Sequence, residues 1–381
     1  MSHSAAETIK TQQSIYEASG VVYREAELDD NATIKSVLRE NSMDSWVTLS
    51  TEHEPCYFDS NNLFGTTQTI LACEDDITHS VIGVCSSVVM PIHINGKTIN
   101  AGYLGSLRVE PAFRHKMSVL RNGFKSIRTL TEIEQELPYW FTSIAKENSA
   151  ARRLLEANLR GMPVYRPLGE LQTIALSTRL GKKSTLLQYA QNEDIPALAQ
   201  FYNQQASGYQ YSPVITEQWL KGLDGKNGLC LRDFWLLKEE GVIRACFALW
   251  DQRKIKQTVV RGYRFPLNIF RQAYNLYAGL SGRVALPACG EKIDYVFIAF
   301  LAIDNAAQPE TETIIRSALS LIKERAAKMA MLGLSTKSPL LQYLESLPGQ
   351  IYSTCIESVT WSDQAKKSFE PLPIQPEIAI L

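Results

Sequence analysis

Residues 101–127 read AGYLGSLRVEPAFRHKMSVLRNGFKSI, and this stretch predicts three successive elements. Tyr103 to Val109 is rich in branched and aromatic residues, which predicts a buried strand. Pro111 lacks a backbone N–H and ends that strand. After the basic run Arg114-His115-Lys116, apolar residues recur at helical spacing from 119 to 127. A strand, a basic turn and a helix start direct N–H groups and a positive helix end at one place, which suits a phosphate group.

The composition predicts a globular protein without a dominant charge. The chain has 381 residues, of which 45% are apolar and 21% charged, and its formal net charge is -1. This length suits two domains. The charge balance gives no basic field for nucleic acid, so we expect small molecules or proteins as partners.

The cysteines and histidines show no pattern typical of a metal site or a disulfide framework. Seven cysteines are scattered without a C-x-x-C pair, and several lie in apolar runs, which favours core thiols in a reducing compartment. The spacing of the five histidines does not suggest zinc ligands. We therefore expect no metal, and we do not predict a cysteine nucleophile.

The N-terminal residues predict a flexible arm rather than a targeting segment. Residues 1–20 are polar and contain no apolar core of a secretory signal. No apolar run reaches the roughly 18 residues that suggest a membrane span. We expect a cytoplasmic protein with no membrane partner.

Upstream of the decisive stretch, the pattern predicts a strand and helix over 21–38 and then an antiparallel meander. Residues 41–65 are irregular, and we interpret them as a surface loop with a few anchoring aromatic side chains. Thr67 to Cys73 and Val81 to Ile92 predict two strands. Asn95-Gly96 predicts a two-residue hairpin turn that leads directly into the strand at Tyr103.

Downstream, a strand is followed by a short helical segment. Tyr139 to Ala145 predicts the strand, and Lys146-Glu147-Asn148-Ser149-Ala150-Ala151-Arg152-Arg153-Leu154-Leu155 begins the helix. Residues 162–176 predict further strand structure that would complete a first domain.

Two of these segments resemble the signatures of the GNAT superfamily, the acyl-CoA-dependent N-acyltransferases. Leu107-Arg108-Val109-Glu110-Pro111-x-x-Arg114 resembles the central strand and the entry to the phosphate loop. Asn148, Ala151 and Leu154 fit the second signature. The family's glycine-rich loop has small residues where this chain has Met117 and Val119, and its frequent general-acid tyrosine is Leu155 here.

The resemblance implies an acyl-CoA site between two diverging strands, with acetyl-CoA as the expected co-substrate. The residues it places around the cofactor are Leu107, Val109, Arg114, His115, Lys116, Met117, Ser118, Val119 and Asn148. Asn148 is equally well explained as the cap of the helix that follows it. Tyr103, on the central strand, is the candidate catalytic residue, and a buried structural tyrosine is its alternative.

The second half repeats the first faintly, which predicts a duplicated domain. Tyr295 to Ile303 corresponds to the central strand, a helix is expected over 311–328, and 332–344 echoes 142–155. Its turn at 304–309 lacks arginine and glycine, so we expect no CoA there. The predicted fold is α/β (α+β): two tandem GNAT-like domains, 21–178 and 184–381, each a twisted mixed sheet flanked by helices and joined near Arg179-Leu180-Gly181-Lys182-Lys183-Ser184.

The resemblance implies transfer of an acyl group from acyl-CoA to an amine of a small molecule or peptide. The second domain would then shape the acceptor site or stabilise the first domain. The alternative is a catalytically degenerate pair that binds or regulates, as the residues at 117, 119 and 155 allow. A third class, aminoacyl transfer from a charged RNA, is disfavoured by the net charge. The acceptor and the oligomeric state are left open.

Overall fold

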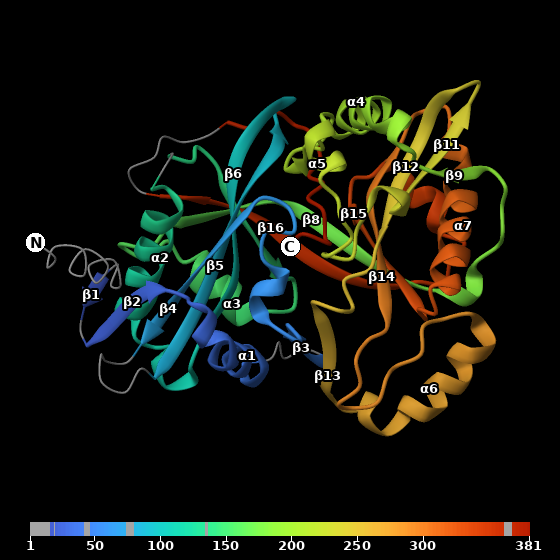
Figure 1. Cartoon of the computed structure of the whole chain (residues 1–381). Helices are drawn as coiled ribbons and strands as arrows, with labels where there is room; N and C mark the ends of the chain where they lie inside the picture. The colour runs from blue at the N-terminus through green and yellow to red at the C-terminus, as the bar shows by residue number, and fades with distance from the viewer. Residues whose placement is uncertain (1–15, 19, 42–45, 74–79, 134–135, 362–367) are drawn as a thin grey trace, which may run out of the picture.

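The strands of both halves belong to one long mixed sheet (Figure 1). The computed structural model describes residues 16–18, 20–41, 46–73, 80–133, 136–361 and 368–381. Within this part of the chain, the hydrogen-bonded order is β1-β2-β4-β5-β6-β7-β16-β8-β15-β14-β12-β11-β9; β10 pairs with β5, and β3 with β13 forms a separate ribbon. The mixed sheet flanked by helices confirms the predicted fold class.

The element bounds follow the chain order. The strands of the first half are β1 (Tyr16–Ala18), β2 (Val21–Glu25), β3 (Val47–Glu52), β4 (Thr66–Cys73), β5 (Val81–Ile94), β6 (Lys97–Val109), β7 (Trp140–Ala145) and β8 (Val164–Ser177). Those of the second half are β9 (Leu187–Tyr189), β10 (Ser212–Pro213), β11 (Phe234–Glu239), β12 (Val242–Trp250), β13 (Gln257–Tyr263), β14 (Tyr295–Ile303), β15 (Met329–Ser335) and β16 (Gln350–Thr360). The α-helices are α1 (Asn31–Glu40), α2 (Met117–Thr131), α3 (Ser149–Leu155), α4 (Ile195–Ala206), α5 (Glu217–Lys221), α6 (Leu267–Ser281) and α7 (Thr311–Glu324).

Among the described strands, each half contains one parallel pair in an otherwise antiparallel environment. In the first half β6 runs parallel to β7, and in the second β14 runs parallel to β15. A long helix follows the first strand of each pair, α2 after β6 and α7 after β14. The chain therefore builds the same strand–helix–strand unit twice, as the sequence repeat indicates.

The two halves exchange strands at the centre of the sheet. β16, from the end of the chain, lies between β7 and β8. β8 pairs on its other side with β15. The expectation that residues 162–176 complete the sheet of the first half alone is wrong, because both neighbours of β8 come from the second half. The domain limits stay a prediction, but the strand pairing crosses them.

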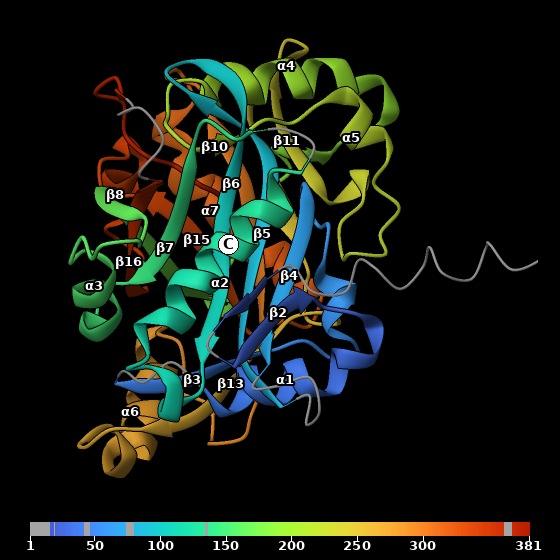
Figure 2. The same ribbon diagram turned by 90° about the vertical axis from the view of Figure 1, so that its left-hand side faces the viewer.

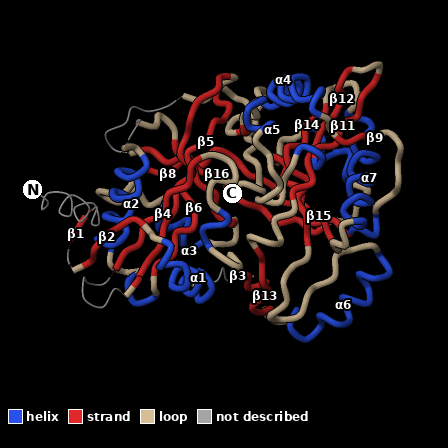
Figure 3. The backbone as a smooth tube through the Cα atoms, in the orientation of Figure 1, coloured by secondary structure: helices blue, strands red, loops and turns tan. Residues whose placement is uncertain are grey.

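Helices lie against the sheet (Figures 2 and 3). On α2 the buried side chains include Val119, Leu120, Phe124 and Ile127, which pack on the sheet of the first half. The predicted helical spacing over 119–127 is thereby confirmed. The helix expected over 311–328 ends earlier, at Glu324, because Ala326 adopts a positive φ of 58° that no helix continues.

Residues 46–65 are more structured than the sequence indicates. They contain β3, which pairs with β13 across the two halves, and Tyr57 is almost completely buried. The interpretation of this stretch as a surface loop is wrong for β3, whose partner lies about half the chain away and leaves no local signal.

Candidate functional site

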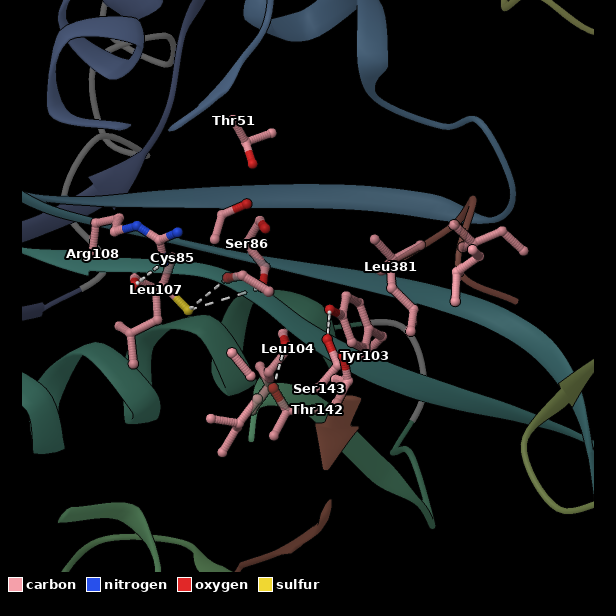
Figure 4. Close-up of a pocket in the computed structure, with 18 of the residues that line it drawn as sticks. Thr51, Cys85, Ser86, Tyr103, Leu104, Leu107, Arg108, Thr142, Ser143 and Leu381 are labelled. Carbon is pink, nitrogen blue, oxygen red and sulfur yellow. Dashed lines mark hydrogen bonds between the residues drawn. The ribbon is translucent and has the colours of Figure 1, made fainter. Parts of the chain in front are cut away.

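The candidate site lies where β6 and β7 separate. The two strands pair from Gly102–Trp140 to Leu104–Thr142 and then diverge. Ser106, just beyond the last pair, has a φ of 53° and marks a bulge against β5. A cavity of about 440 Å³ occupies the gap between the two strands (Figure 4).

Both halves of the chain contribute to the cavity wall. From the first half come Ser86, Tyr103, Ser106, Arg108, Ser143 and Asn148. From the second half come Lys256, Tyr352, Ile378, Ile380 and Leu381. The second half therefore completes the site instead of only supporting it.

Tyr103 bridges the gap between the diverging strands. Its hydroxyl lies 2.7 Å from Oγ of Ser143, which stands on β7 (Figure 4). Burial raises the pKa of Tyr103, so the phenol keeps its proton at neutral pH. The structure thus places this predicted residue at the divergence point with a proton to donate. Its role in catalysis stays a prediction.

Arg108 brings a positive charge into the wall of the cavity. Its guanidinium donates to the carbonyl groups of Asn41 (3.0 Å) and Leu107 (2.8 Å), which are neutral partners. Burial lowers the pKa of Arg108, although an arginine stays protonated at neutral pH. Arg108 is half-buried, and these two carbonyl partners do not neutralise its charge. The sequence motif contained Arg108, but only the fold shows that its side chain turns toward the cavity.

At another part of the wall, His53 is held in one tautomer. The hydroxyl of Ser60 donates to the carbonyl of Tyr57 (2.8 Å), so its oxygen accepts from Nδ1 of His53 (2.6 Å). Nε2 of His53 is left as a hydrogen-bond acceptor. Burial lowers the pKa of His53 to about 3, which keeps the ring neutral.

Lys256 lies near His53 and also borders the cavity. Its Nζ donates to the backbone oxygen of Leu381 (2.8 Å), and burial lowers its pKa to about 8. The side chain is therefore largely charged at neutral pH. Sequence reasoning missed both residues, because they come together only through the pairing of β3 with β13.

The predicted basic turn does form the start of α2. Arg114 donates to the carbonyl of Val109 (2.9 Å) and to Oδ1 of Asn41 (2.7 Å), and Lys116 lies over the ring of Phe113. His115 and Ser118 are exposed. The turn stands outside the set of residues that line the cavity, and phosphate binding there stays a prediction.

Two predicted cofactor residues serve the packing of the first half. Val119 is buried in the core, its N–H donates to the carbonyl of Lys116, and Met117 is half-buried against the same core. Of the two strand residues, Leu107 lines the cavity and Val109 lies beside it, against α2.

Asn148 was predicted either to cap the helix that follows it or to contact the cofactor, and its position allows both. Its Oδ1 accepts from the N–H of Ala151 (3.1 Å), so it caps α3. It also lines the cavity, as does Leu155 on the same helix. The cap is shown, and contact with a pantetheine arm stays a prediction.

The corresponding gap in the second half is filled by the chain itself. β14 and β15 pair up to Ile298–Leu332, and Phe300, with a φ of 52°, occupies the same position as Ser106 in the first half. The N–H of Phe300 donates to the carboxylate of Glu377 (2.7 Å). Gln375 hydrogen-bonds to both the N–H of Ser335 (2.8 Å) and the carbonyl of Gly333 (2.9 Å) on β15.

The described part of the chain lacks two other kinds of feature. Within the described residues, no group of three or more His, Cys, Asp or Glu side chains is arranged to hold a metal ion. The described helices include none that is long and apolar enough to cross a membrane.

Comparison with known proteins identifies the fold. No protein-family model matches the chain, and no curated protein matches it either. Among solved structures, Saccharomyces cerevisiae N-myristoyltransferase with bound myristoyl-CoA is 11% identical, with a TM-score of 0.60 over 93% of this chain and 86% of that one. A GCN5-related N-acetyltransferase from Sphaerobacter thermophilus is also 11% identical, with a TM-score of 0.54 over 93% of this chain and all of that one (100%). The chain therefore shares its fold with this N-myristoyltransferase and this GCN5-related N-acetyltransferase.

Proposed function

We propose that this protein transfers an acyl group from acyl-CoA to an amine, with its cofactor site in the first half of the chain. The observation that carries the proposal is the open gap between β6 and β7. It has the position that the GNAT resemblance assigns to the pantetheine arm, and it contains a cavity of about 440 Å³. The fold shared with acyl-CoA-binding proteins supports this assignment.

The cofactor would lie across the gap with its phosphates toward the start of α2. Ser143 and Asn148 stand on the β7 side, where a pantetheine arm would hydrogen-bond. Arg114 and Lys116 would neutralise the phosphates together with the positive end of α2. The proposed co-substrate is acetyl-CoA or another acyl-CoA. Comparing the affinities of acyl-CoA thioesters of different chain length would identify the preferred acyl group.

The reaction would be direct attack by a neutral amine on the thioester carbonyl. The nitrogen–carbon bond forms, the carbon–sulfur bond breaks, and the amine loses one proton while the thiolate gains one. Tyr103 is protonated and lies at the divergence point, so it is placed to give that proton to the thiolate. The N–H groups of the bulge at Ser106 are the candidates to polarise the carbonyl.

The acceptor amine, of a small molecule or a peptide, would enter from the His53 side. The charge of Lys256 disfavours an ammonium ion nearby and so favours the neutral, nucleophilic amine. Nε2 of His53 would accept an N–H from that amine and orient it.

A catalytically inactive binding protein is the second candidate. Leu155 lines the cavity at the position where the family carries a proton donor, and Val119 is committed to the core. On this alternative, acyl-CoA binds in the same gap but is not turned over.

Measuring release of the CoA thiol in the presence of a panel of amines distinguishes the acyltransferase from the inactive binding protein. We expect turnover, and we expect Tyr103→Phe to lower kcat by about 100-fold while acyl-CoA binding is kept. Asn148→Ala, by contrast, is expected mainly to weaken acyl-CoA binding. Tight binding without thiol release for any amine would favour the inactive alternative.

A further inference from the structure

Helix α6 presents an apolar face to solvent. Its sequence is LNIFRQAYNLYAGLS, and Ala278 is its only buried residue. The large exposed apolar side chains on α6 and just before it are Phe265, Ile269, Phe270, Leu276, Tyr277 and Leu280, with exposed fractions between 53% and 85%. We call these six residues the α6 face. Single exposed apolar residues are normal on a protein surface, whereas a cluster of them marks an interaction surface.

The opposite side of α6 is fixed to the body of the protein. The hydroxyl of Tyr274 accepts from Gln350 (2.6 Å). Asn275 exchanges two hydrogen bonds with the backbone of Leu286 (2.9 and 2.7 Å), and Arg271 donates to the same carbonyl (3.1 Å). Since these anchors lie one helical turn apart on one side, the apolar side is held outward. Figure 1 shows α6 at the periphery of the second half.

The segment around α6 is basic. Between Asp251 and Glu291 the sequence contains no acidic residue, whereas Arg264, Arg271 and Arg283 lie on or beside the helix. Arg179, from another part of the chain, donates to the carbonyl of Gly279 near the C-terminal end of α6. An apolar helix face with arginines near both of its ends is complementary to an anionic lipid surface.

We propose that α6 docks this protein in the plane of an anionic phospholipid bilayer, with the α6 face among the acyl chains. Trp46 is 57% exposed and its carbonyl accepts from the N–H of Arg264, so a tryptophan borders the start of the helix. Tryptophan and tyrosine are the side chains favoured at the membrane–water interface. The helix, with 15 residues, would lie on the bilayer and not cross it.

A second copy of the chain is a poorer partner for the α6 face. Symmetric pairing would bring the arginines of both copies together, and no acidic residue in this segment would compensate them. The sequence prediction of no membrane partner rested on the search for a long apolar run, which cannot detect an amphipathic helix. The docking proposal goes beyond the proposed function and does not depend on acyl transfer.

Vesicle flotation with the full chain tests the docking. We expect the protein to float with vesicles of phosphatidylcholine and phosphatidylglycerol and to bind vesicles of pure phosphatidylcholine far less. Raising the salt from about 0.15 M to about 1 M should weaken the binding, because the charge attraction is screened. Ile269→Ser combined with Leu280→Ser should reduce the bound fraction about tenfold or more.

A matched variant controls for the loss of surface apolarity. Leu28→Ser removes a side chain that is 72% exposed in the first half, and it should leave vesicle binding unchanged. An unchanged circular dichroism spectrum and melting temperature in the double variant exclude unfolding. Absence of binding to anionic vesicles overturns the proposal, and so does a dimer in solution that the double variant dissociates. Binding that the double variant keeps would overturn the role of α6.

Discussion

The two gaps between parallel strands have the same bulge at the same position but are occupied differently. In the first half, the gap beyond Leu104–Thr142 contains a cavity; in the second, the gap beyond Ile298–Leu332 holds residues 374–379 of the chain. Both bulges place a residue with positive φ at the same position, Ser106 in one and Phe300 in the other. The filled gap shows what the open one lacks: a carboxylate on the bulge N–H and an amide group on the facing strand.

The comparison indicates how the open gap would bind a ligand. Glu377 accepts from the bulge, and Gln375 both accepts from and donates to β15. These are the groups that a thioester carbonyl and an amide-containing pantetheine arm would present to β6 and β7. The second half therefore stabilises the protein with its own chain, and we infer that the first half leaves the equivalent place for a cofactor.

Blocking the open gap should have the largest effect. Ser143→Leu adds bulk between β6 and β7 and removes the partner of Tyr103, so acyl-CoA binding should weaken by more than about 100-fold. Isothermal titration measures it. Unaltered binding would mean that the cofactor lies elsewhere.

Crowding the filled gap should mainly lower the stability of the protein, because Ile378, which would be displaced, packs against β15 there. A Cβ at Gly333 would overlap Cγ2 of Ile378, so Gly333→Ala should lower the free energy of unfolding by about 1–3 kcal/mol. Urea denaturation measures the loss. Gly262→Ala, where the nearest atoms of Thr48 are 3.7 Å away, is the matched control and should cost about 1 kcal/mol or less. Equal losses in both variants would contradict close packing of the second gap.

The carboxyl in the filled gap predicts a pH dependence of stability. Burial raises the pKa of Glu377 from its ordinary value of 4.5 to about 7. Between these pH values the folded state holds a proton that the unfolded state has lost, so stability falls as pH rises from about 4.5 to about 7 and then levels off. The expected loss is on the order of 1–3 kcal/mol. Glu377→Gln should flatten part of this slope.

A second buried carboxyl serves as the comparison for that slope. Burial, with the charge of Glu156, raises the pKa of Glu357 to about 7 as well. Glu357→Gln should therefore remove another part of the same slope while leaving the second gap intact. If Glu377→Gln left the pH profile of the wild-type protein unchanged, the carboxyl of Glu377 would not be titrating in the filled gap.

The phosphate turn should give the smallest effect. Arg114→Ala combined with Lys116→Ala should weaken CoA binding about tenfold, because two exposed cations contribute moderately at physiological salt. The salt dependence of binding should decrease in the double variant. An identical salt dependence would place the phosphates away from the start of α2.

The local parts of this architecture were predictable from the sequence. The strand over 103–109, the Asn95-Gly96 turn and the helix over 119–127 each carry their own period or turn chemistry, and all are present. The placement of β16 between β7 and β8 was not predictable, because it joins residues that are far apart in the chain.

The site was predictable only where it coincides with a motif. Tyr103, Leu107 and Asn148 line the cavity, and their roles in catalysis and cofactor binding stay predictions. His53 and Lys256 carry no motif and meet through the β3–β13 ribbon. Residues 374–379, which fill the second gap, have no periodic pattern in the sequence. Their role is visible only in the fold, where they hydrogen-bond to the N–H groups of Phe300 and Ser335.

The open gap is tested as the cofactor site by isothermal titration of acetyl-CoA and longer acyl-CoA thioesters into three proteins: the wild-type chain, Ser143→Leu and Glu377→Gln. We expect one binding site per chain, lost in Ser143→Leu and kept in Glu377→Gln. No binding to the wild-type chain at millimolar ligand, or binding that is lost only in Glu377→Gln, would contradict it.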